Sequence, residues 1–490
     1  MTCLTNSRQE NTTSRKSNRA MSMQNWALRA CGVFLLWAAT AALLPAQTYT
    51  VLYTFRGGGD GANPGSAVVQ GTNGNFYGVI QNGGVYEMTP GGTTTILHSF
   101  TGPADPLGAL IQATDGNFYG TTYFGGASAN CEYGCGTIFK MTPSGTLTTF
   151  YSFCPEINCP DGIGPYAGLV QGSEGNLYGT TLVGGANGQG AIFKINLTGT
   201  FTALYSFCSE ADCADGQQPY AGLVVGSDGN LYGTASAGGA IGDGTVFRIT
   251  PSGAFTTLHS FDGTDGTAPT AALIQAANGR FYGTTGGGAS GNGTVFEMTP
   301  GGSLATLVSF DGTDGDNPFN PLVQATDGNF YGTTENGGTG GTHCNTSSGC
   351  GTAFEMTPGG TLTTLQIFDP LVGNYPNGLI QSTNGTFYGT TLVDGNDGGG
   401  WGTIFSLDTG LGAFVETQPT SGPAGLDVKI LGNNLGSTTG VAFNGTAATF
   451  TVVSPSLIRT TVPAGATRGS VQVTTSSGTL TSNVAFRVRP

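Results

Sequence analysis

Residues 228–233 read Asp-Gly-Asn-Leu-Tyr-Gly, and this stretch decides the fold because the chain repeats it seven times. Each copy has an acidic residue or Asn, then Gly, any residue, Phe or Leu, Tyr and Gly. The copies are Asn73–Gly78, Asp115–Gly120, Glu174–Gly179, Asp228–Gly233, Asn278–Gly283, Asp327–Gly332 and Asn384–Gly389. Their tyrosines are 42 to 59 residues apart. One four-stranded β-propeller blade takes about 40–50 residues, so the spacing predicts one blade per copy.

The residues around the motif predict four short strands in each unit. In residues 221–261, Asp228-Gly229 and Pro251-Ser252-Gly253 are turn sequences whose glycines tolerate positive φ. Between the turns, β-branched and aromatic residues alternate roughly with small or polar ones. The predicted strands are Ala221–Ser227, Asn230–Ala235, Gly244–Thr250 and Ala254–Phe261. Seven such units predict an all-β chain that forms a seven-bladed β-propeller.

The two ends of the repeat region predict how the ring closes. The seventh unit has a third strand at Gly402–Leu407, but only the weak segment Gly412–Val415 follows it. A spare fourth strand, Tyr49–Phe55, precedes the first unit and matches Thr93–Phe100. We therefore expect the N-terminal strand to complete the last blade, which leaves no exposed sheet edge.

The repeats closely resemble the Gloeo-Verruco (GloVer) tandem repeat of exported bacterial proteins. That pattern joins D-G-N-[FL]-Y-G-T-T to G-T-[VI]-F-x-x-T-P-x-G, which here are Asp327–Thr334 and Gly351–Gly359. The first unit departs from it, with Val79-Ile80 in place of the Thr-Thr pair. The resemblance implies an exported or surface-attached protein, and it supports the fold rather than any one activity.

After the last repeat, a small second domain is predicted. Strand-like segments include Val441–Gly445, Ala447–Val452 and Leu457–Pro463, and short strands without a helix are typical of a β-sandwich. The segment looks like an IPT/TIG immunoglobulin-like domain, which implies a spacer or adhesion unit. The predicted division is a signal peptide at 1–46, the propeller at 47–414 and the sandwich at 415–490.

The N-terminus is typical of an export signal. A basic lead-in precedes the apolar run Gly32–Leu44, and Leu44-Pro45-Ala46 offers a cleavage site before Gln47. Thirteen apolar residues are short for a bilayer span, which needs about 20; an uncleaved anchor is the alternative. The start codon is Met1, Met21 or Met23. We expect a secreted or cell-surface protein with no membrane span once the signal is cleaved.

The charge distribution excludes one class of partner. Residues 47–415 carry 5 basic and 26 acidic residues, whereas residues 416–490 carry 5 and 2. A strongly negative propeller repels phosphate backbones, so nucleic acid is not expected as a partner. The expected partner is an extracellular glycan or protein, and the expected state is a monomer.

Eight cysteines follow the leader, in four closely spaced pairs. Local disulfides in an oxidising compartment explain such spacing. Zinc is the alternative, but His343 beside Cys344 is the sole histidine near a pair, and one histidine does not make a four-ligand site. The predicted disulfides are Cys131/Cys135, Cys154/Cys159, Cys208/Cys213 and Cys344/Cys350.

All length variation and all eight of these cysteines fall on one face, which we call the loop face. It carries the second-to-third-strand loops and the blade-to-blade loops, whereas the opposite, hairpin face carries uniformly short turns. Function tends to reside on variable loops. The predicted function is an exported binding or adhesion protein that presents this acidic face to its partner.

No catalytic residue is predicted, because no Ser/His/Asp or Cys/His set stands out. His98 and His259 share an outer-strand position with Tyr151, Tyr205 and Val308, which indicates packing or surface exposure. The alternative is a polysaccharide-active hydrolase or lyase with a site at the channel mouth, since a pair of carboxylates is a spatial feature.

Five blade-to-blade loops share Asp-Gly-x-x-Pro, beginning at Asp60, Asp161, Asp215, Asp265 and Asp314. The plain interpretation is a turn that the Asp caps. The alternative is calcium, which prefers clustered oxygen ligands. The candidate calcium ligands are Asp262, Asp265, Asp311, Asp314 and Asp316.

Overall fold

The computed structural model describes residues 47–81, 83–338, 349–395 and 400–489. The predicted signal peptide and Cys344 lie outside these ranges. Within them, no helix is long and apolar enough to cross a membrane.

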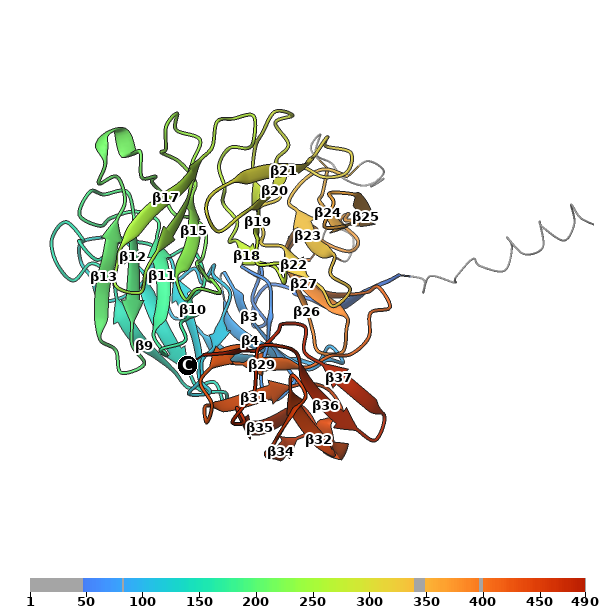
Figure 1. The fold of residues 1–490 in the computed structure, drawn as a ribbon. Helices are drawn as coiled ribbons and strands as arrows, with labels where there is room; N and C mark the ends of the chain where they lie inside the picture. Colours follow the sequence, from blue (N-terminus) through green and yellow to red (C-terminus); the bar gives the residue numbers. More distant parts are fainter. Residues whose placement is uncertain (1–46, 82, 339–348, 396–399, 490) are drawn as a thin grey trace, which may run out of the picture. The chain divides into compact units, whose positions relative to one another are not determined.

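Seven four-stranded antiparallel sheets form the propeller (Figure 1). Blades 1 to 3 are β2 (Val69–Gln70), β3 (Phe76–Ile80), β4 (Gly84–Met88), β5 (Thr94–Ser99); β6 (Ile111–Gln112), β7 (Phe118–Thr122), β8 (Thr137–Met141), β9 (Leu147–Ser152); and β10 (Val170–Gln171), β11 (Leu177–Thr181), β12 (Ala191–Ile195), β13 (Phe201–Ser206). Blades 4 to 6 are β14 (Val224–Val225), β15 (Leu231–Ala235), β16 (Thr245–Ile249), β17 (Phe255–Ser260); β18 (Ile274–Gln275), β19 (Phe281–Thr285), β20 (Thr294–Met298), β21 (Leu304–Ser309); and β22 (Val323–Gln324), β23 (Phe330–Thr334), β24 (Thr352–Met356), β25 (Leu362–Ile367). Blade 7 is β26 (Asn374–Gln381), β27 (Phe387–Val393), β28 (Thr403–Asp408) and β1 (Thr48–Thr54).

The last blade is closed by the N-terminal strand, as predicted. β1 pairs antiparallel with β28 from Thr48 opposite Asp408 to Thr54 opposite Thr403. The Tyr49 ring stacks on Phe405 with a centroid distance of 5.2 Å. Because the two ends of the repeat region meet in one sheet, the ring cannot open without losing this strand.

The repeated glycine and phenylalanine face each other across the two middle strands of a blade. In blade 3, Gly179 of β11 lies opposite Phe193 of β12. A Cβ at Gly179 would lie 2.6 Å from the Phe193 ring, which is closer than real Cβ contacts. The two halves of the repeat motif are therefore one packing unit: the glycine makes room for the ring.

The repeated Phe-Tyr or Leu-Tyr pair joins each blade to the next. Tyr77 of blade 1 packs on Phe118 of blade 2, with 4.1 Å between ring centroids. Tyr388 of blade 7 packs on Phe76 of blade 1 at the same distance, so the series closes on itself. These rings are buried and supply much of the apolar burial between neighbouring blades.

Each of these tyrosines also receives a polar partner at the hairpin face. In blade 2, the Tyr119 hydroxyl donates to Asp115 of the turn (2.9 Å), and Lys140 pairs with the same carboxylate (3.1 Å). In blade 1 the turn has Asn73 instead, and Glu87 from β4 accepts the Tyr77 hydroxyl (2.7 Å). In blades 2 to 4 an acidic turn thus accompanies a basic third strand, and in blade 1 an Asn turn accompanies an acidic one. Blade 5 repeats the second arrangement with Asn278 and Glu297. Blade 6 differs, with Asp327 in the turn and Glu355 on the third strand, and so does blade 7, with Asn384 and Ser406.

This pattern predicts a compensating pair of substitutions in blade 2. Asp115→Asn removes the carboxylate that Tyr119 and Lys140 contact, and should cost about 1–2 kcal/mol. Lys140→Glu in the same chain recreates the blade 1 arrangement and should recover at least half of that loss. The measurement is a double-mutant cycle by thermal unfolding of the four chains. Purely additive losses would contradict the assignment.

The C-terminal domain is a β-sandwich of two four-stranded sheets. One contains β29 (Glu416–Gln418), β31 (Asp427–Leu431), β35 (Leu457–Thr461) and β34 (Phe450–Ser454), and the other β33 (Thr446–Ala448), β32 (Gly440–Phe443), β36 (Val471–Thr475) and β37 (Gly478–Thr481). β30 (Ser421–Gly422) pairs in parallel with β38 (Arg487–Val488). Two short 3₁₀ turns, Ala211–Cys213 and Leu435–Ser437, complete the described elements. Val428, Ile430 and Phe443 lie in the sandwich core.

The sandwich contacts the hairpin face of the propeller. Lys429 donates to the Thr114 carbonyl oxygen (3.1 Å), Arg489 to Ser173 (2.8 Å) and Ser456 to the Thr72 carbonyl oxygen (3.0 Å). These three propeller residues all lie in first-to-second-strand turns, next to the inner strands. The loop face is therefore the face that the sandwich does not cover.

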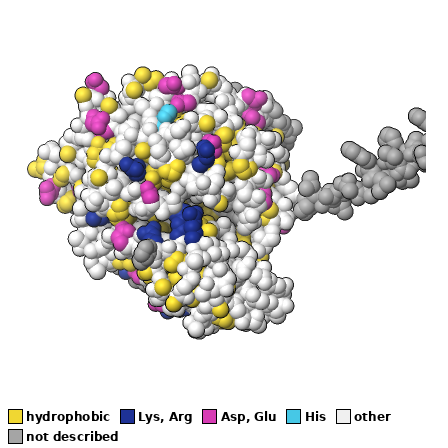
Figure 2. All heavy atoms as spheres, viewed as in Figure 1, with side chains coloured by type: hydrophobic (Ala, Val, Ile, Leu, Met, Phe, Trp, Pro, Cys, Tyr) yellow, Lys and Arg dark blue, Asp and Glu magenta, His cyan; other side chains and the backbone are white. Residues whose placement is uncertain are grey.

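A cleft of about 920 Å³ separates the sandwich from the inner strands of blades 1 to 4. Its sandwich side carries Lys429, Arg459, Arg487 and Arg489. Burial and the nearby Arg459 lower the pKa of Lys429. Figure 2 shows Lys and Arg side chains gathered where the C-terminal strands of Figure 1 meet the propeller. Four of the five basic residues of the C-terminal domain thus line the cleft between the two domains.

Candidate functional site

Four aromatic side chains meet at the loop-face end of the propeller axis. Tyr166 lies between Tyr123 (6.2 Å between centroids) and Tyr220 (4.6 Å), and Tyr220 also contacts Phe319 (6.2 Å). We call these four the mouth aromatics. They come from blades 2, 3, 4 and 6, so the contact between Tyr220 and Phe319 passes over blade 5. The cluster therefore lies across the channel mouth.

The Asp-Gly-x-x-Pro loops place three of these rings. Tyr166, Tyr220 and Phe319 each follow the proline of such a loop and precede the inner strand of their blade. The residue before each proline has a positive φ, for example 55° at Gln218, and this turn directs the chain toward the axis. Blade 5 has Thr270 at the matching position, and its buried hydroxyl has no hydrogen-bond partner in the described part of the chain.

The mouth aromatics keep polar groups free. In the ranges that the structure describes, the hydroxyls of Tyr123, Tyr166 and Tyr220 have no hydrogen bond to another residue, and all four rings are partly exposed. Burial raises the pKa of Tyr166 to about 12, with a smaller contribution from Tyr220. At neutral pH the Tyr166 hydroxyl is therefore protonated and can donate as well as accept.

One carboxylate lies beside this cluster. Glu335 follows β23 and accepts a hydrogen bond from the Asn317 side chain (2.6 Å). Burial, and to a smaller extent Asp316, raise the pKa of Glu335, while the Asn317 hydrogen bond lowers it. Glu335 also acts electrostatically on Tyr166. The mouth thus combines aromatic faces, free hydroxyls, an amide and a carboxyl group.

The Asp of the Asp-Gly-x-x-Pro loop caps its own loop and anchors it to the outer strand. Asp215 accepts hydrogen bonds from the Tyr205 hydroxyl (2.6 Å) and the Ser209 backbone amide (2.9 Å). Asp265 pairs with His259 at 2.7 Å, so the outer-strand position that holds His or Tyr has a structural partner. This agrees with the turn interpretation.

The candidate calcium ligands make turn hydrogen bonds. Asp311 accepts from the amides of Thr313 (2.8 Å) and Asp314 (3.2 Å), and Asp262 makes the same contacts one blade earlier. Asp265 and Asp314 accept from the amides of Asp262 and Asp311, and Asp316 pairs through its backbone with Asn336. Calcium binding at these five residues stays a prediction. Within the described ranges, the one group of three or more possible metal ligands with converging ligand atoms consists of cysteines.

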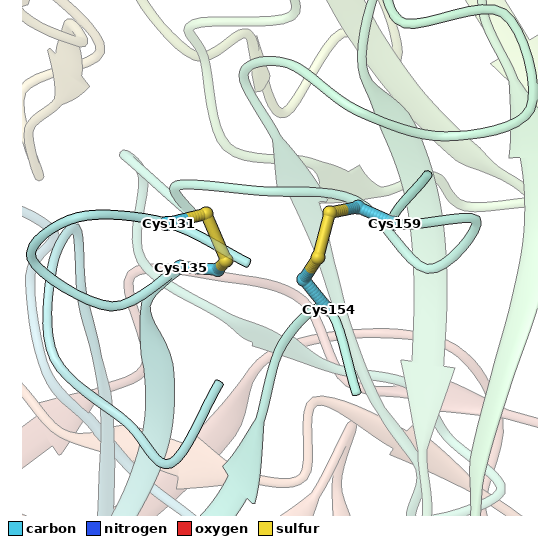
Figure 3. Close-up of side chains that lie close together, drawn as sticks. All are labelled: Cys131, Cys135, Cys154 and Cys159. Carbon is cyan, nitrogen blue, oxygen red and sulfur yellow. A yellow bond between two sulfur atoms is a disulfide. The ribbon is translucent and has the colours of Figure 1, made fainter. Parts of the chain in front are cut away.

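Three of the four predicted cysteine pairs are disulfides in the structure: Cys131–Cys135, Cys154–Cys159 and Cys208–Cys213. Cys350 is also disulfide-bonded, and its predicted partner Cys344 lies outside the described residues. Figure 3 shows the first two disulfides side by side. The sequence placed both pairs on the loop face but did not predict this contact.

The sequence also did not identify the mouth aromatics. A signal was present, because the residue after the loop proline varies widely: it is Gly65, Leu107, Tyr166, Tyr220, Thr270, Phe319 or Asn377. A variable residue at a fixed place in a ring of repeats marks a functional surface better than the repeated residues do.

Comparison with known families agrees with this architecture. The family model described as "Gloeobacter/Verrucomicrobia repeat" matches residues 39–214 and 209–343, which together are more than half of the chain. The chain belongs to this repeat family. A second model, the IPT/TIG domain, matches residues 414–488. Members of the repeat family are thus expected to share the blade described above, and this chain adds the immunoglobulin-like domain after it.

Among solved structures, the chain is similar to other propellers at low identity. A gluconolactonase from Xanthomonas campestris has 13% identity and a TM-score of 0.39, with 76% of this chain and 92% of that chain covered. A candidate 6-phosphogluconolactonase from Bacteroides uniformis has 16% identity and a TM-score of 0.42, with 67% and 89% covered. No curated protein matches the chain.

Proposed function

We propose that this protein is an exported glycan-binding protein, and that the mouth aromatics at the uncovered end of the channel form its binding site. The observation that supports this most is the contact series from Tyr123 through Tyr166 and Tyr220 to Phe319. Its rings are partly exposed, and three of them carry hydroxyls that no described residue uses.

The chemistry of the mouth suits a sugar. The faces of pyranose rings carry C–H groups that pack on aromatic rings, whereas their edges carry hydroxyls that need hydrogen-bond partners. Tyrosine supplies an apolar face and a polar end in one side chain. Glu335, held by Asn317, adds an acceptor at the side of the cluster. A few polar groups among aromatic side chains are typical of small-molecule sites.

The other domain supports a binding role. The sandwich belongs to the IPT/TIG class and lies on the hairpin face through Lys429, Ser456 and Arg489. It therefore leaves the loop face free, as a spacer or adhesion unit should. Disulfides in the loops suit the predicted export to an oxidising compartment.

A glycan array with residues 47–490 tests the proposal. Tyr166→Ala and Tyr220→Ala are each expected to weaken binding at least tenfold, because aromatic anchors carry a large share of binding energy. Tyr133→Ala is the matched control: it removes an exposed loop-face tyrosine that is not a mouth aromatic, and binding should persist. Equal binding by all three variants would show that the glycan-binding site lies elsewhere. Repeating the array with EDTA tests the calcium prediction.

A catalytic role is the second candidate, because burial, with a smaller contribution from Asp316, raises the pKa of Glu335 at the channel mouth. A carboxyl group that stays protonated to higher pH suits a general acid. Bound glycans should then be cleaved by the parent chain and left intact by Glu335→Gln. Binding without cleavage by the parent chain favours the binding protein. If no glycan binds, the proposed ligand class is wrong and a protein partner takes its place.

A further inference from the structure

Blade 2 brings two disulfides together. The ligand atoms of Cys131, Cys135, Cys154 and Cys159 all lie within 4.8 Å of one another, and Figure 3 shows the four sulfur atoms between the two loops. Cys135, Cys154 and Cys159 are buried, and Cys131 is partly buried. Each disulfide closes only its own loop, so the convergence of the pairs is not required by either cross-link.

The arrangement is specific to this blade. Cys131 and Cys135 lie in the loop after β7, and Cys154 and Cys159 lie in the loop after β9. Blade 3 has the second pair, Cys208–Cys213, but no cysteine between β11 and β12, where Asn187 reaches across to the Phe207 carbonyl oxygen (3.1 Å). The blade 3 pair thus supplies a natural control.

We propose that these four cysteines form a zinc site when they are reduced, with all four thiolates as ligands. Tetrahedral Cys₄ coordination is a standard structural zinc site, and a Zn–S distance of about 2.3 Å places the sulfur atoms roughly 3.8 Å apart. The four sulfur atoms already lie within 4.8 Å of one another. The two pairs therefore need to move little relative to each other to bind the metal. Within each pair, the two sulfur atoms must move from bonding distance to the spacing of a zinc site, which a rotation of the cysteine side chains provides.

The surrounding loops already hold the four positions. The Ser128 hydroxyl donates to the Cys154 carbonyl oxygen (2.6 Å), and the Asn130 side chain donates to the same oxygen (3.0 Å). The Cys135 sulfur lies 3.5 Å from the Ser128 oxygen, so the Ser128 hydroxyl can turn to donate to a thiolate there in place of the Cys154 carbonyl oxygen. Such outer contacts orient metal ligands and tune affinity.

Conversion of the two disulfides to the zinc site requires a reductant. A thiol or phosphine reductant supplies two electrons to each disulfide, and each S–S bond breaks to give two thiols with two protons from water. Zn²⁺ then binds the four sulfurs as thiolates and releases four protons, so affinity rises with pH. The metal form would tie the two loops to each other, whereas the disulfide form ties each loop only to itself.

Cobalt titration of residues 47–490, reduced with a phosphine under anaerobic conditions, tests the site. One equivalent of Co²⁺ should give the thiolate-to-cobalt charge-transfer band and the visible bands of tetrahedral cobalt, and one equivalent of Zn²⁺ should remove them. The oxidised chain should show neither. Cys131→Ser/Cys135→Ser should weaken metal binding about 100-fold or more, while Cys208→Ser/Cys213→Ser should leave it unchanged.

Thermal unfolding of each chain, followed by circular dichroism, tests whether reduction or substitution has unfolded the protein. If the reduced chain loses its transition, one equivalent of Zn²⁺ should restore it in the parent and the blade 3 variant but not in the blade 2 variant. Absence of tetrahedral cobalt bands in the folded reduced chain overturns the proposal. So does a failure of zinc to restore folding, or equal binding by the two double variants.

Discussion

Removing β1 is expected to abolish the native propeller. A chain that begins at residue 57 loses the strand that pairs with β28 and the buried ring of Phe55, which packs on Tyr86 of blade 1 (5.5 Å between centroids). Loss of one buried Phe side chain alone costs about 3–5 kcal/mol. Since a folded domain is stable by only about 5–15 kcal/mol, loss of the whole strand should leave no cooperative transition near the parent temperature.

Calorimetry of the two chains measures this effect, and a peptide of residues 47–56 provides the control. The peptide added in trans should restore the transition, because it can occupy the free edge of β28. Phe310→Ala, at the matching position of blade 5, should lower the melting temperature without removing the transition. A truncated chain that melts at the parent temperature would show that β1 does not close the ring.

The architecture was predictable because its signals are local and repeated. Each Asp-Gly or Asn-Gly turn fixes a hairpin, and the spare strand Tyr49–Phe55 completes the unpaired β28. The bounds of the inner strands were not predictable. Ala221–Ser227 was expected as one strand, yet β14 contains only Val224–Val225, because it pairs with β15 over only these two residues. Gly412–Val415 forms no strand, because β1 takes its place.

The candidate site depends on contacts that no single repeat contains. Tyr220 and Phe319 meet across blade 5, and Cys135 meets Cys154 because a second-to-third-strand loop lies beside the next blade-to-blade loop. Sequence spacing identifies each residue's loop but not its neighbour in another loop. The exchange of acidic partners between the hairpin turn and the third strand, as at Glu87, likewise required the register of the sheet.

Asp215→Asn is expected to be the most damaging single substitution in a blade-to-blade loop. The Asp215 side chain is fully buried, and it accepts hydrogen bonds from the Tyr205 hydroxyl and from the Ser209 amide and hydroxyl, at 2.6 to 3.0 Å. The side-chain amide of Asn carries no charge, and its NH₂ group cannot accept a hydrogen bond. Some of these donors would therefore face another donor. Leaving buried donors unpaired should cost about 2–3 kcal/mol, seen as a lower melting temperature by calorimetry.

Asp314→Asn is the matched control, and its effect on stability is expected to have the opposite sign to that of Asp215→Asn. The outer strand there has Val308, which offers the carboxylate no hydroxyl, and burial together with Asp311 raises the pKa of Asp314 above its ordinary value of 3.8. Folding therefore favours the protonated form, so this group's contribution to stability is full below pH 3.8 and declines as the pH rises through the folded-state pKa. At pH 7 the Asn variant should be as stable as the parent or more stable, and the difference should vanish in acid. Equal losses from the two substitutions would contradict the assigned role of the outer-strand tyrosine, because that tyrosine is the difference between the two loops.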